Sequence, residues 1–379
     1  MTIYTVKPGD SIDAIAAKYG VPAERIIYVN QLTYPYRIAV GQALLITFNE
    51  IYGGTGIIAN GFAYPFISPW VLEQTLPFLT ELSVFSYGFT IEGDLVNPVL
   101  PTEWMIRAAI DYGVSPVLTL TPFGPDGQFN NYLIHRMLSD TESRNRLIRN
   151  IYDAVLYRGY EGVNIDFEFI LAEDRDLFTE FVRDVTYAIN ELGYEVTVDL
   201  APKTSADQPG LLYEGKDYPA LGEAANRVLI MTYEWGYTYG PAMAVAPINK
   251  VREVIEYAVT EIPPEKISMG VPNYGYDWPL PYVRGESKAK TIGNIEALQI
   301  AVNNNVEILF DETSKAPYFS YVSNGVTHEV WFEDARSILA KYRLRDEYGL
   351  HGIGCWQIMQ LFRVMWILAQ GDIWSISIE

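Results

Sequence analysis

The heptapeptide Gly162–Glu168 reads Gly-Val-Asn-Ile-Asp-Phe-Glu. Its alternation of apolar and polar residues predicts a β-strand, because successive side chains of a strand point to opposite faces. One face carries Val163, Ile165 and Phe167, and the other carries Asn164, Asp166 and Glu168. Same-face neighbours on a strand lie about 6–7 Å apart, so three polar groups, two of them acidic, form a row.

Two explanations of this row compete. A solvent-facing strand at the edge of a sheet could carry acidic residues without a function. The flanking sequence favours an interior strand, because helical patterns over Glu142–Arg158 and Asp174–Leu192 lie on either side of it. Interior parallel strands are apolar on both faces, and burying an unpaired polar group costs about 1–3 kcal/mol. The row therefore predicts a carboxylate site at the C-terminal end of a barrel strand.

Strand-like and helical segments alternate over residues 56–379. The eight predicted strands are Ile57–Phe62, Leu82–Tyr87, Ser115–Leu120, Gly162–Glu168, Glu195–Leu200, Arg227–Tyr233, Ile267–Pro272 and Gly352–Gln357. Eight βα units predict an α/β fold of the (β/α)8, or TIM, barrel type, with its active site at the strand C-termini. The gap before the last strand is too long for one helix. We therefore expect a small α+β insertion there, over about residues 281–348, with strand-like stretches at Pro317–Val322 and His328–Phe332.

Length and composition suggest several domains with a large core. The chain has 379 residues, of which 49% are hydrophobic. We expect a first domain at residues 1–48, a linker at 49–55 and the barrel at 56–379. The formal net charge of −20 argues against nucleic acid or an anionic membrane as partner. It also opposes non-specific retention on an anionic cell wall, so binding to a wall would require a dedicated module.

The remaining composition excludes several kinds of site. Cys355 is the single cysteine, so an intramolecular disulfide is excluded. His135, His328 and His351 are scattered along the chain, and we expect no metal and no cofactor. The N-terminus has no signal-peptide pattern, and no apolar run reaches the length of a membrane helix. The sequence does not fix the oligomeric state, and a monomer is the working expectation.

Residues 1–48 follow the order strand, helix, helix, strand. Asp10 is predicted to be the N-cap of the first helix, with Asp13 answering it as in a capping box. That helix carries an apolar stripe and ends near Gly20, and a second helix follows Pro22. The strand Gly41–Ile46 completes a βααβ unit.

This unit resembles a LysM domain along its whole length. The matching pattern runs from Tyr4-x-Val6-x-x-Gly9-Asp10 through Asn30 to Gly41-Gln42-x-Leu44-x-Ile46. The resemblance implies binding of N-acetylglucosamine-containing glycans in the groove between the turns at residues 9–12 and 30–34. The glycan-binding candidates are Gly9, Asp10, Ile12, Asn30 and Leu32. An unrelated small α+β domain is the alternative, and capping is the alternative role of Asp10.

The heptapeptide also carries a resemblance. Together with Glu161 it is similar to the Asp-x-x-Asp-x-Asp-x-Glu signature of the glycoside hydrolase family 18 chitinases. Asp166 and Glu168 match the last two positions, whereas Glu161 and Asn164 depart from the first two. The Asn-Ile-Asp-Phe-Glu form resembles a bacterial branch of the family, the spore-cortex-lytic N-acetylglucosaminidases.

The resemblance implies a reaction in which the substrate assists. Most glycosidases use two carboxyl groups, but family 18 is an exception. Glu168 would protonate the leaving oxygen, and the acetamide oxygen of the substrate would attack, giving an oxazolinium ion. Asp166 would bind the acetamide nitrogen, and Tyr233, in a Met-Thr-Tyr-Glu motif, would hold the acetamide oxygen. Trp356 matches the tryptophan that floors the site; for Trp356 and Tyr233 the alternative is core packing.

Asn164 stands where the family has an aspartate. Two adjacent carboxylates raise one pKa, and Asn164 removes that like charge. We therefore expect Asp166 to ionise more easily and to be stabilised by hydrogen bonds instead. Glu161 is expected to give structural support only.

Further substrate contacts are expected near other strand ends, because aromatic rings offer flat apolar faces to sugars. A partly structural role is the alternative for each aromatic residue. The aromatic candidates are Trp235, Tyr274, Trp278 and Trp356, followed by Tyr64, Phe66 and Tyr237. The polar candidates for substrate binding are Asn164 and Glu234.

Three longer segments extend the resemblance to the spore-cortex enzymes: Met231–Gly236, Val271–Trp278 and Val330–Ser337. The resemblance implies a retaining enzyme that cleaves cortex peptidoglycan after N-acetylglucosamine and is packed into the spore from the cytoplasm. Chitin oligomers as substrate, or a catalytically silent glycan-binding coat protein, are the alternatives. The LysM unit would supply targeting, so activity on soluble fragments should survive deletion of residues 1–48. Exo or endo action stays open.

Overall fold

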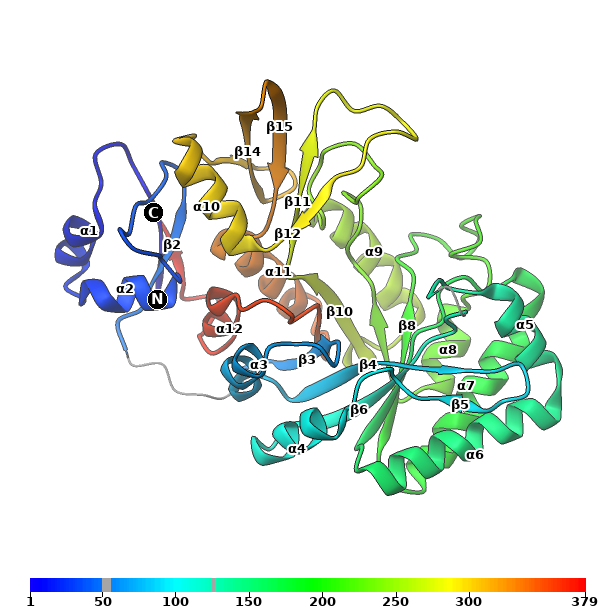
Figure 1. The fold of residues 1–379 in the computed structure, drawn as a ribbon. Helices are drawn as coiled ribbons and strands as arrows, with labels where there is room; N and C mark the ends of the chain where they lie inside the picture. Colours follow the sequence, from blue (N-terminus) through cyan, green and yellow to red (C-terminus); the bar gives the residue numbers. More distant parts are fainter. Residues whose placement is uncertain (50–55, 125–126) are drawn as a thin grey trace.

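Eight parallel strands close into a barrel in the computed structural model, which describes residues 1–49, 56–124 and 127–379 (Figure 1). Pairing of β3 with β4 completes the ring. In ring order the strands are β3 (Ile58–Ala63), β16 (Gly352–Trp356), β10 (Ile267–Pro272), β9 (Arg227–Ile230), β8 (Glu195–Leu200), β7 (Gly162–Ile165), β6 (Ser115–Leu120) and β4 (Glu81–Phe89). The predicted TIM barrel is confirmed.

Helices surround the barrel. They are α3 (Pro69–Thr75), α4 (Glu103–Asp111), α5 (Asn131–Ser139), α6 (Thr141–Arg158), α7 (Arg175–Asn190), α8 (Tyr218–Ala224), α9 (Ile248–Glu261), α11 (Ala335–Glu347) and α12 (Arg363–Ala369). A short strand β5 (Leu95–Val96) pairs antiparallel with the end of β4. None of the helices in the described ranges is long and apolar enough to cross a membrane.

Two strands end three residues earlier than the sequence predicts. β7 ends at Ile165 and not at Glu168, and β9 ends at Ile230 and not at Tyr233. After β9 the main chain bonds to itself, because Thr232 N donates to Ile230 O (2.8 Å) and Tyr233 N donates to Met231 O (2.9 Å). These local bonds replace the ladder after β9, whereas after β7 Asp166 N still donates to Leu120 O of β6 (2.9 Å).

The predicted faces of the heptapeptide are confirmed. Val163, Ile165 and Phe167 are at most 1% exposed and belong to the main hydrophobic core. Phe167 stacks on Phe178 and Phe181 of α7, with ring centroids 5.5 Å and 5.9 Å apart. Burying a large apolar side chain contributes about 1.5–3 kcal/mol, so this face fixes the strand against the helix layer.

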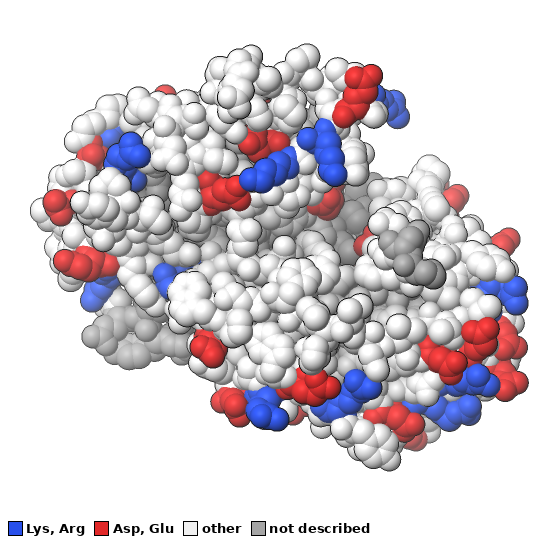
Figure 2. Space-filling view, in the orientation of Figure 1, with Lys and Arg blue, Asp and Glu red and all other residues white. Residues whose placement is uncertain are grey.

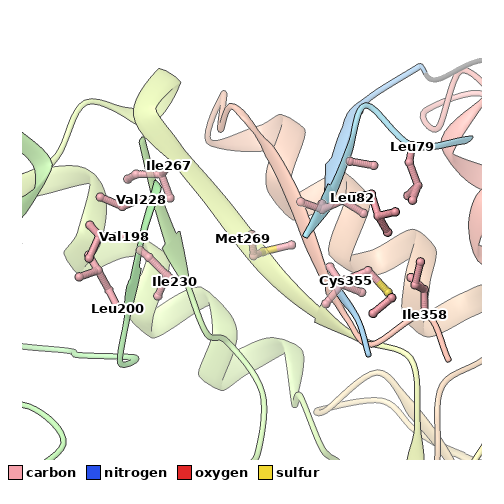
Figure 3. Close-up of a cluster of buried hydrophobic side chains, with 14 of the residues drawn as sticks. Leu79, Leu82, Val198, Leu200, Val228, Ile230, Ile267, Met269, Cys355 and Ile358 are labelled. Atoms are coloured by element: carbon pink, nitrogen blue, oxygen red, sulfur yellow. The ribbon is translucent and has the colours of Figure 1, made fainter. Parts of the chain in front are cut away.

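The other strands contribute in the same way. Figure 3 shows buried side chains of β8, β9, β10 and β16 projecting from the barrel wall. The labelled residues of these strands are Val198, Leu200, Val228, Ile230, Ile267, Met269 and Cys355. The barrel wall is therefore fixed by packing, and the strand ends are free to carry polar groups.

The N-terminal domain is built on a three-stranded sheet. β1 (Thr2–Thr5) lies between β2 (Ala43–Ile46) and the C-terminal strand β17 (Ser377–Ile378). The helices α1 (Ile12–Tyr19) and α2 (Ala23–Val29) complete the unit. In Figure 1 the two chain ends accordingly lie close together in this domain.

The first helix of this domain starts differently from the prediction. Ser11, and not Asp10, is the N-cap of α1, and its Oγ accepts a bond from Ala14 N (3.2 Å). Asp10 instead accepts bonds from Lys7 N and Tyr4 Oη, both at 2.7 Å, and closes the preceding turn. The predicted capping box is wrong, because the cap shift places Asp13 at the second helical position.

The N-terminal domain is fused to the barrel by a common core. Ile3, Val29, Ala43 and Leu45 belong to the same buried cluster as the barrel strands. Gln31 adds polar contacts: Nε2 donates to Leu361 O (3.0 Å), and Oε1 accepts from Arg363 N (2.6 Å). Deleting residues 1–48 would uncover this core, so the expected survival of activity does not follow. The predicted linker, apart from Asn49, lies outside the described residues.

The insertion is a five-stranded antiparallel sheet with one helix. Its elements are β11 (Gly275–Pro279), β12 (Lys290–Ile292), α10 (Asn294–Asn304), β13 (Leu309–Asp311), β14 (Ala316–Ser323) and β15 (Val326–Trp331). It begins before the predicted residue 281, because β11 pairs with β15. It also ends before residue 348, because α11 packs on β10, α9 and α12 of the barrel. Figure 2 shows scattered charges over one face, hollowed between the insertion and the barrel.

Candidate active site

A cavity of about 270 Å³ lies at the C-terminal ends of the barrel strands. It is lined by Phe62, Tyr64, Phe85, Phe123, Phe129, Asp166, Glu168, Asp199, Met231, Tyr233, Glu234 and Trp356. The residues predicted to carry the chemistry thus meet in one place. Within the described ranges no group of His, Cys, Asp or Glu side chains could hold a metal ion.

The two carboxyl groups of the heptapeptide have different environments. Burial, and then the negative charge of Asp166, raise the pKa of Glu168 to about 8. Burial raises the pKa of Asp166 to about 6, and the positive charge of Lys216 opposes that rise. At neutral pH Glu168 therefore carries a proton and Asp166 is mostly ionised, which is the division of roles that an acid and an anionic stabiliser require.

A third carboxyl group, Asp199 of β8, was missed by the sequence prediction. Ile165 of β7 pairs with Val198 of β8, so the next pair in register places Asp199 beside Asp166. Asn164 Nδ2 donates to Asp199 Oδ2 (2.9 Å). Burial, and then the charge of Asp166, raise the pKa of Asp199 well above its usual range. A second carboxyl group thus lies beside Asp166, where the sequence prediction expected none.

Lys216 completes this buried group. It precedes α8, is 1% exposed, and its Nζ donates to the main-chain oxygen of Asp199 (2.8 Å). Burial lowers the pKa of Lys216 to about 8, against the opposing charges of Asp166, Asp199 and Glu168. No local pattern marks Lys216, because a loop brings it to the site.

Hydrogen bonds do not take over the stabilisation of Asp166 as expected. Its Oδ1 is buried and has no partner in the described part of the chain. The Oδ1 atoms of Asn164 and Asp199 are likewise buried and have no hydrogen-bond partner among the described residues. Unpaired acceptors of this kind cost about 1–3 kcal/mol each. Asp166 therefore retains capacity to accept a further hydrogen bond.

Tyr233 and Trp356 form the walls of the cavity. Trp356 is half-buried and meets Phe85 edge-on, with ring centroids 4.8 Å apart. Burial and the nearby carboxyl groups raise the pKa of Tyr233 far above its usual range, so its hydroxyl stays a neutral donor. A Cβ on Gly270 would lie 2.7 Å from a ring carbon of Tyr233, so this glycine makes room for the ring.

Glu234 has hydrogen-bond partners that the sequence did not indicate. Its φ of +69° lies in the left-handed region, which is strained for a residue other than glycine. Its carboxylate accepts bonds from the hydroxyls of Tyr274 and Tyr276, and the Tyr276 bond is 2.9 Å long. The two tyrosines thus hold Glu234 at the mouth of the cavity.

The predicted aromatic platforms divide into two groups. Trp278 is 1% exposed with its Nε1 bonded to Gly240 O (2.9 Å), and Tyr274 is 5% exposed. Neither presents a face to a sugar, which corrects that prediction. Trp235 is half-buried against the main core and does not line the cavity. Tyr64 and the exposed Phe66 stack at 5.1 Å, and Tyr64 lines the cavity.

The predicted glycan-binding residues of the N-terminal domain mostly support its turns. Asn30 is buried and bonds the main chain of Ile26 and Leu45, and Ile12 lies in the core of the domain. Leu32 packs against that core, and Gly9 stays exposed. Leu32 also lines a second hollow, of about 220 Å³, between the turn at residues 30–37 and α10.

Comparison with known families identifies both parts of the chain. The profile of the glycosyl hydrolases family 18 matches residues 124–360, and that of the LysM domain matches residues 4–47. A cortical fragment-lytic enzyme of Bacillus anthracis is 37% identical in an alignment that covers 97% of each chain.

Solved structures give the same picture. The spore cortex-lytic enzyme SleL of Bacillus cereus superposes with a TM-score of 0.91 at 32% identity, covering 99% of this chain and 98% of that chain. A chitinase of Chromobacterium violaceum, at 21% identity and a TM-score of 0.77, covers 84% of this chain and 99% of its own and shares the fold.

Proposed function

Because the chain belongs to the glycosyl hydrolases of family 18 and carries a LysM domain, we propose that it hydrolyses spore-cortex peptidoglycan. The observation that carries this proposal is the cavity in which Glu168 and Asp166 face Tyr233 and Trp356, and burial raises the pKa of both carboxyl groups. Full-length similarity to enzymes named for cortex lysis supports the choice of polymer and an association with the spore.

The proposed reaction uses the acetamide of the substrate as nucleophile. Glu168 gives its proton to the glycosidic oxygen as the acetamide oxygen closes on the anomeric carbon. Asp166 accepts a hydrogen bond from the acetamide N–H and balances the charge of the oxazolinium ion. Tyr233 donates a hydrogen bond to the acetamide oxygen. Water then opens the ring, Glu168 takes the proton from that water, and the β configuration is retained.

The need for a 2-acetamido group decides which glycosidic bond is cleaved. Only a sugar with a 2-acetamido group can assist, and muramic lactam lacks it. N-acetylmuramic acid has the group, but its 3-O-lactyl arm would have to fit beside Trp356. N-acetylglucosamine has the group without the arm. Cleavage on its reducing side is therefore proposed.

Mass spectrometry of borohydride-reduced products from purified cortex tests the proposal. Products that end in N-acetylglucosaminitol are expected. Products that end in reduced muramic acid would identify a muramidase and contradict it. Turnover of chitin oligomers without release from cortex would favour a chitinase, and no turnover of either would favour a silent glycan-binding protein.

A further inference from the structure

Acidic groups outnumber basic groups at the floor of the cavity. Asp166, Glu168 and Asp199 surround one amine, that of Lys216. If all four were ionised, the group would carry a net charge of −2. Each uncompensated charge in a buried site costs several kcal/mol, so the group retains protons. Neutrality with a charged Lys216 requires two protons on the three carboxyl groups.

Glu168 holds one of these protons, because it is the general acid. The second lies on Asp166 or on Asp199, and the reaction decides between them. Asp166 must be negative opposite the oxazolinium ion. Asp199 faces no comparable demand, and Lys216 Nζ bonds its main-chain oxygen and not its carboxylate.

The hydrogen bonds of the two aspartates fit this assignment. Asp199 Oδ2 is occupied by Asn164 Nδ2 (2.9 Å), which leaves Oδ1 for a proton. Asp199 Oδ1 and Asp166 Oδ1 are both buried without a partner in the described ranges. Adjacent strands lie about 4.8 Å apart, and one hydrogen between the two carboxyl groups would satisfy both atoms.

We propose that Asp199 is a positioning residue that stays protonated during turnover and donates its hydrogen to Asp166, which thereby remains a fixed anion. The proposal rests on the proposed function for the role of Asp166. Asn164 orients Asp199, and Lys216 supplies the charge that balances Asp166. The other ionisable groups that face the pair are Glu168, Tyr233 and Tyr64.

The protons balance over the cycle. When the proton of Glu168 passes to the leaving oxygen, one carboxylate and one oxazolinium cation appear together. The hydrolytic water later returns a proton to Glu168. Asp199 keeps its own proton throughout, so the pair enters the second step unchanged.

Two substitutions at one position test this role. Asparagine has the shape of a protonated aspartate and keeps a donor, whereas leucine keeps the volume and has none. We expect Asp199→Asn to retain at least ten times more kcat than Asp199→Leu, with KM changed less than kcat in both. Turnover should be measured on a fluorogenic N-acetylglucosamine oligomer and on muropeptides. If Asn is no better than Leu, or if Leu equals the wild type, the proposal is overturned.

A direct measurement separates this proposal from the choice of substrate. ¹³C-carboxyl NMR of the free enzyme, with Asp199→Asn to assign the signal, reads the protonation of Asp199 without any turnover. We expect a protonated carboxyl at pH 7. An ionised Asp199 at that pH would overturn the proposal even if cortex is cleaved as proposed. A protonated Asp199 in an enzyme that cleaves no cortex would leave the inference standing and the proposed function refuted.

Discussion

Two buried lysines in this molecule have opposite surroundings. Lys341 of α11 bonds Glu333 (2.8 Å), and both side chains are 1% exposed. Lys216 is buried as deeply, but it faces three carboxyl groups, and its Nζ bonds a main-chain oxygen. One site has as many acids as bases, and the other has an excess of two acids.

The comparison distinguishes buried charges that support the fold from buried charges that can take part in a reaction. A matched pair is neutral when both of its groups are charged, so its carboxyl group needs no proton. An unmatched group must hold protons, and held protons can be given to a substrate. The unpaired acceptors at Asn164, Asp166 and Asp199 belong to the second kind of site.

The largest effect should come from removing the proton donor of the unmatched site. Glu168→Gln is expected to lower kcat about 10²–10⁴-fold, because general acid catalysis contributes that much. Single-turnover assays on muropeptides would measure it. Glu161→Gln is the matched control, since Glu161 lies before the same strand and accepts a bond from Ser115 Oγ (2.8 Å). Near-normal turnover by Glu168→Gln would remove Glu168 from the mechanism.

Breaking the matched pair should affect the fold and not the reaction. Lys341→Met leaves the carboxylate of Glu333 buried alone, which typically costs about 3–5 kcal/mol. Urea unfolding would show this loss, while the folded fraction keeps its kcat. The double variant Glu333→Gln/Lys341→Met should recover most of the stability. A loss below about 1 kcal/mol in the single variant would show that the pair is not isolated from water.

The unmatched site should also set the pH range of activity. Ionised Asp166 is lost as the pH falls through about 6, and protonated Glu168 is lost as the pH rises through about 8. We expect a bell-shaped kcat profile that falls about tenfold per pH unit outside this interval. A stopped assay over pH 4–10 would record it. A flat alkaline side would mean that Glu168 is not the group that titrates.

The contribution of Glu168 to stability should fall with rising pH, also over the range in which activity rises. The pKa of folded Glu168 is raised from 4.5 to about 8, so its favourable contribution is complete below 4.5 and is lost as the pH rises to 8. Glu168→Gln should therefore exceed the wild type in unfolding free energy by at least about 1 kcal/mol at pH 8, and by almost nothing at pH 4.5. Urea titrations at the two pH values test this. An equal difference at both would indicate a packing effect.

The smallest effect is expected away from both lysines, at the N-terminal domain. Tyr34 is 84% exposed beside the hollow at α10. Tyr34→Ala should weaken retention on insoluble wall about fivefold, equivalent to about 1 kcal/mol of ring contact, and lower kcat on soluble fragments by less. Tyr157→Ala, at a 79% exposed position of α6, is the control. Equal retention of both variants would place glycan binding elsewhere on the domain.

The periodicity of the sequence predicted the structural features that depend on periodicity alone. The alternation in Gly162–Glu168 gave the correct faces, because strand periodicity and burial act together there. Thr197 and Asp199 show the same polar alternation on β8, so Asp199 could have been found by the signal used for Asp166. Lys216 could not, since its position depends on the path of a loop.

Two other differences have simple physical causes. Asp10 and Ser11 are both good caps, and the bonds of Asp10 to Tyr4 and Lys7 decide which one caps. Trp278 follows a barrel strand in sequence, as a platform would. It is buried instead because β11 turns into the insertion sheet.

The common core of the N-terminal domain and the barrel fixes the distance between a glycan-binding site on that domain and the active site. A sugar site on a flexible tether samples many distances, whereas one fixed by packing and by Gln31 holds a single distance to Glu168. A glycan strand that reaches both sites would be cut at a set number of sugars from its point of attachment. The length distribution of early products would then show one dominant spacing, and its value in sugars would measure the span of the enzyme.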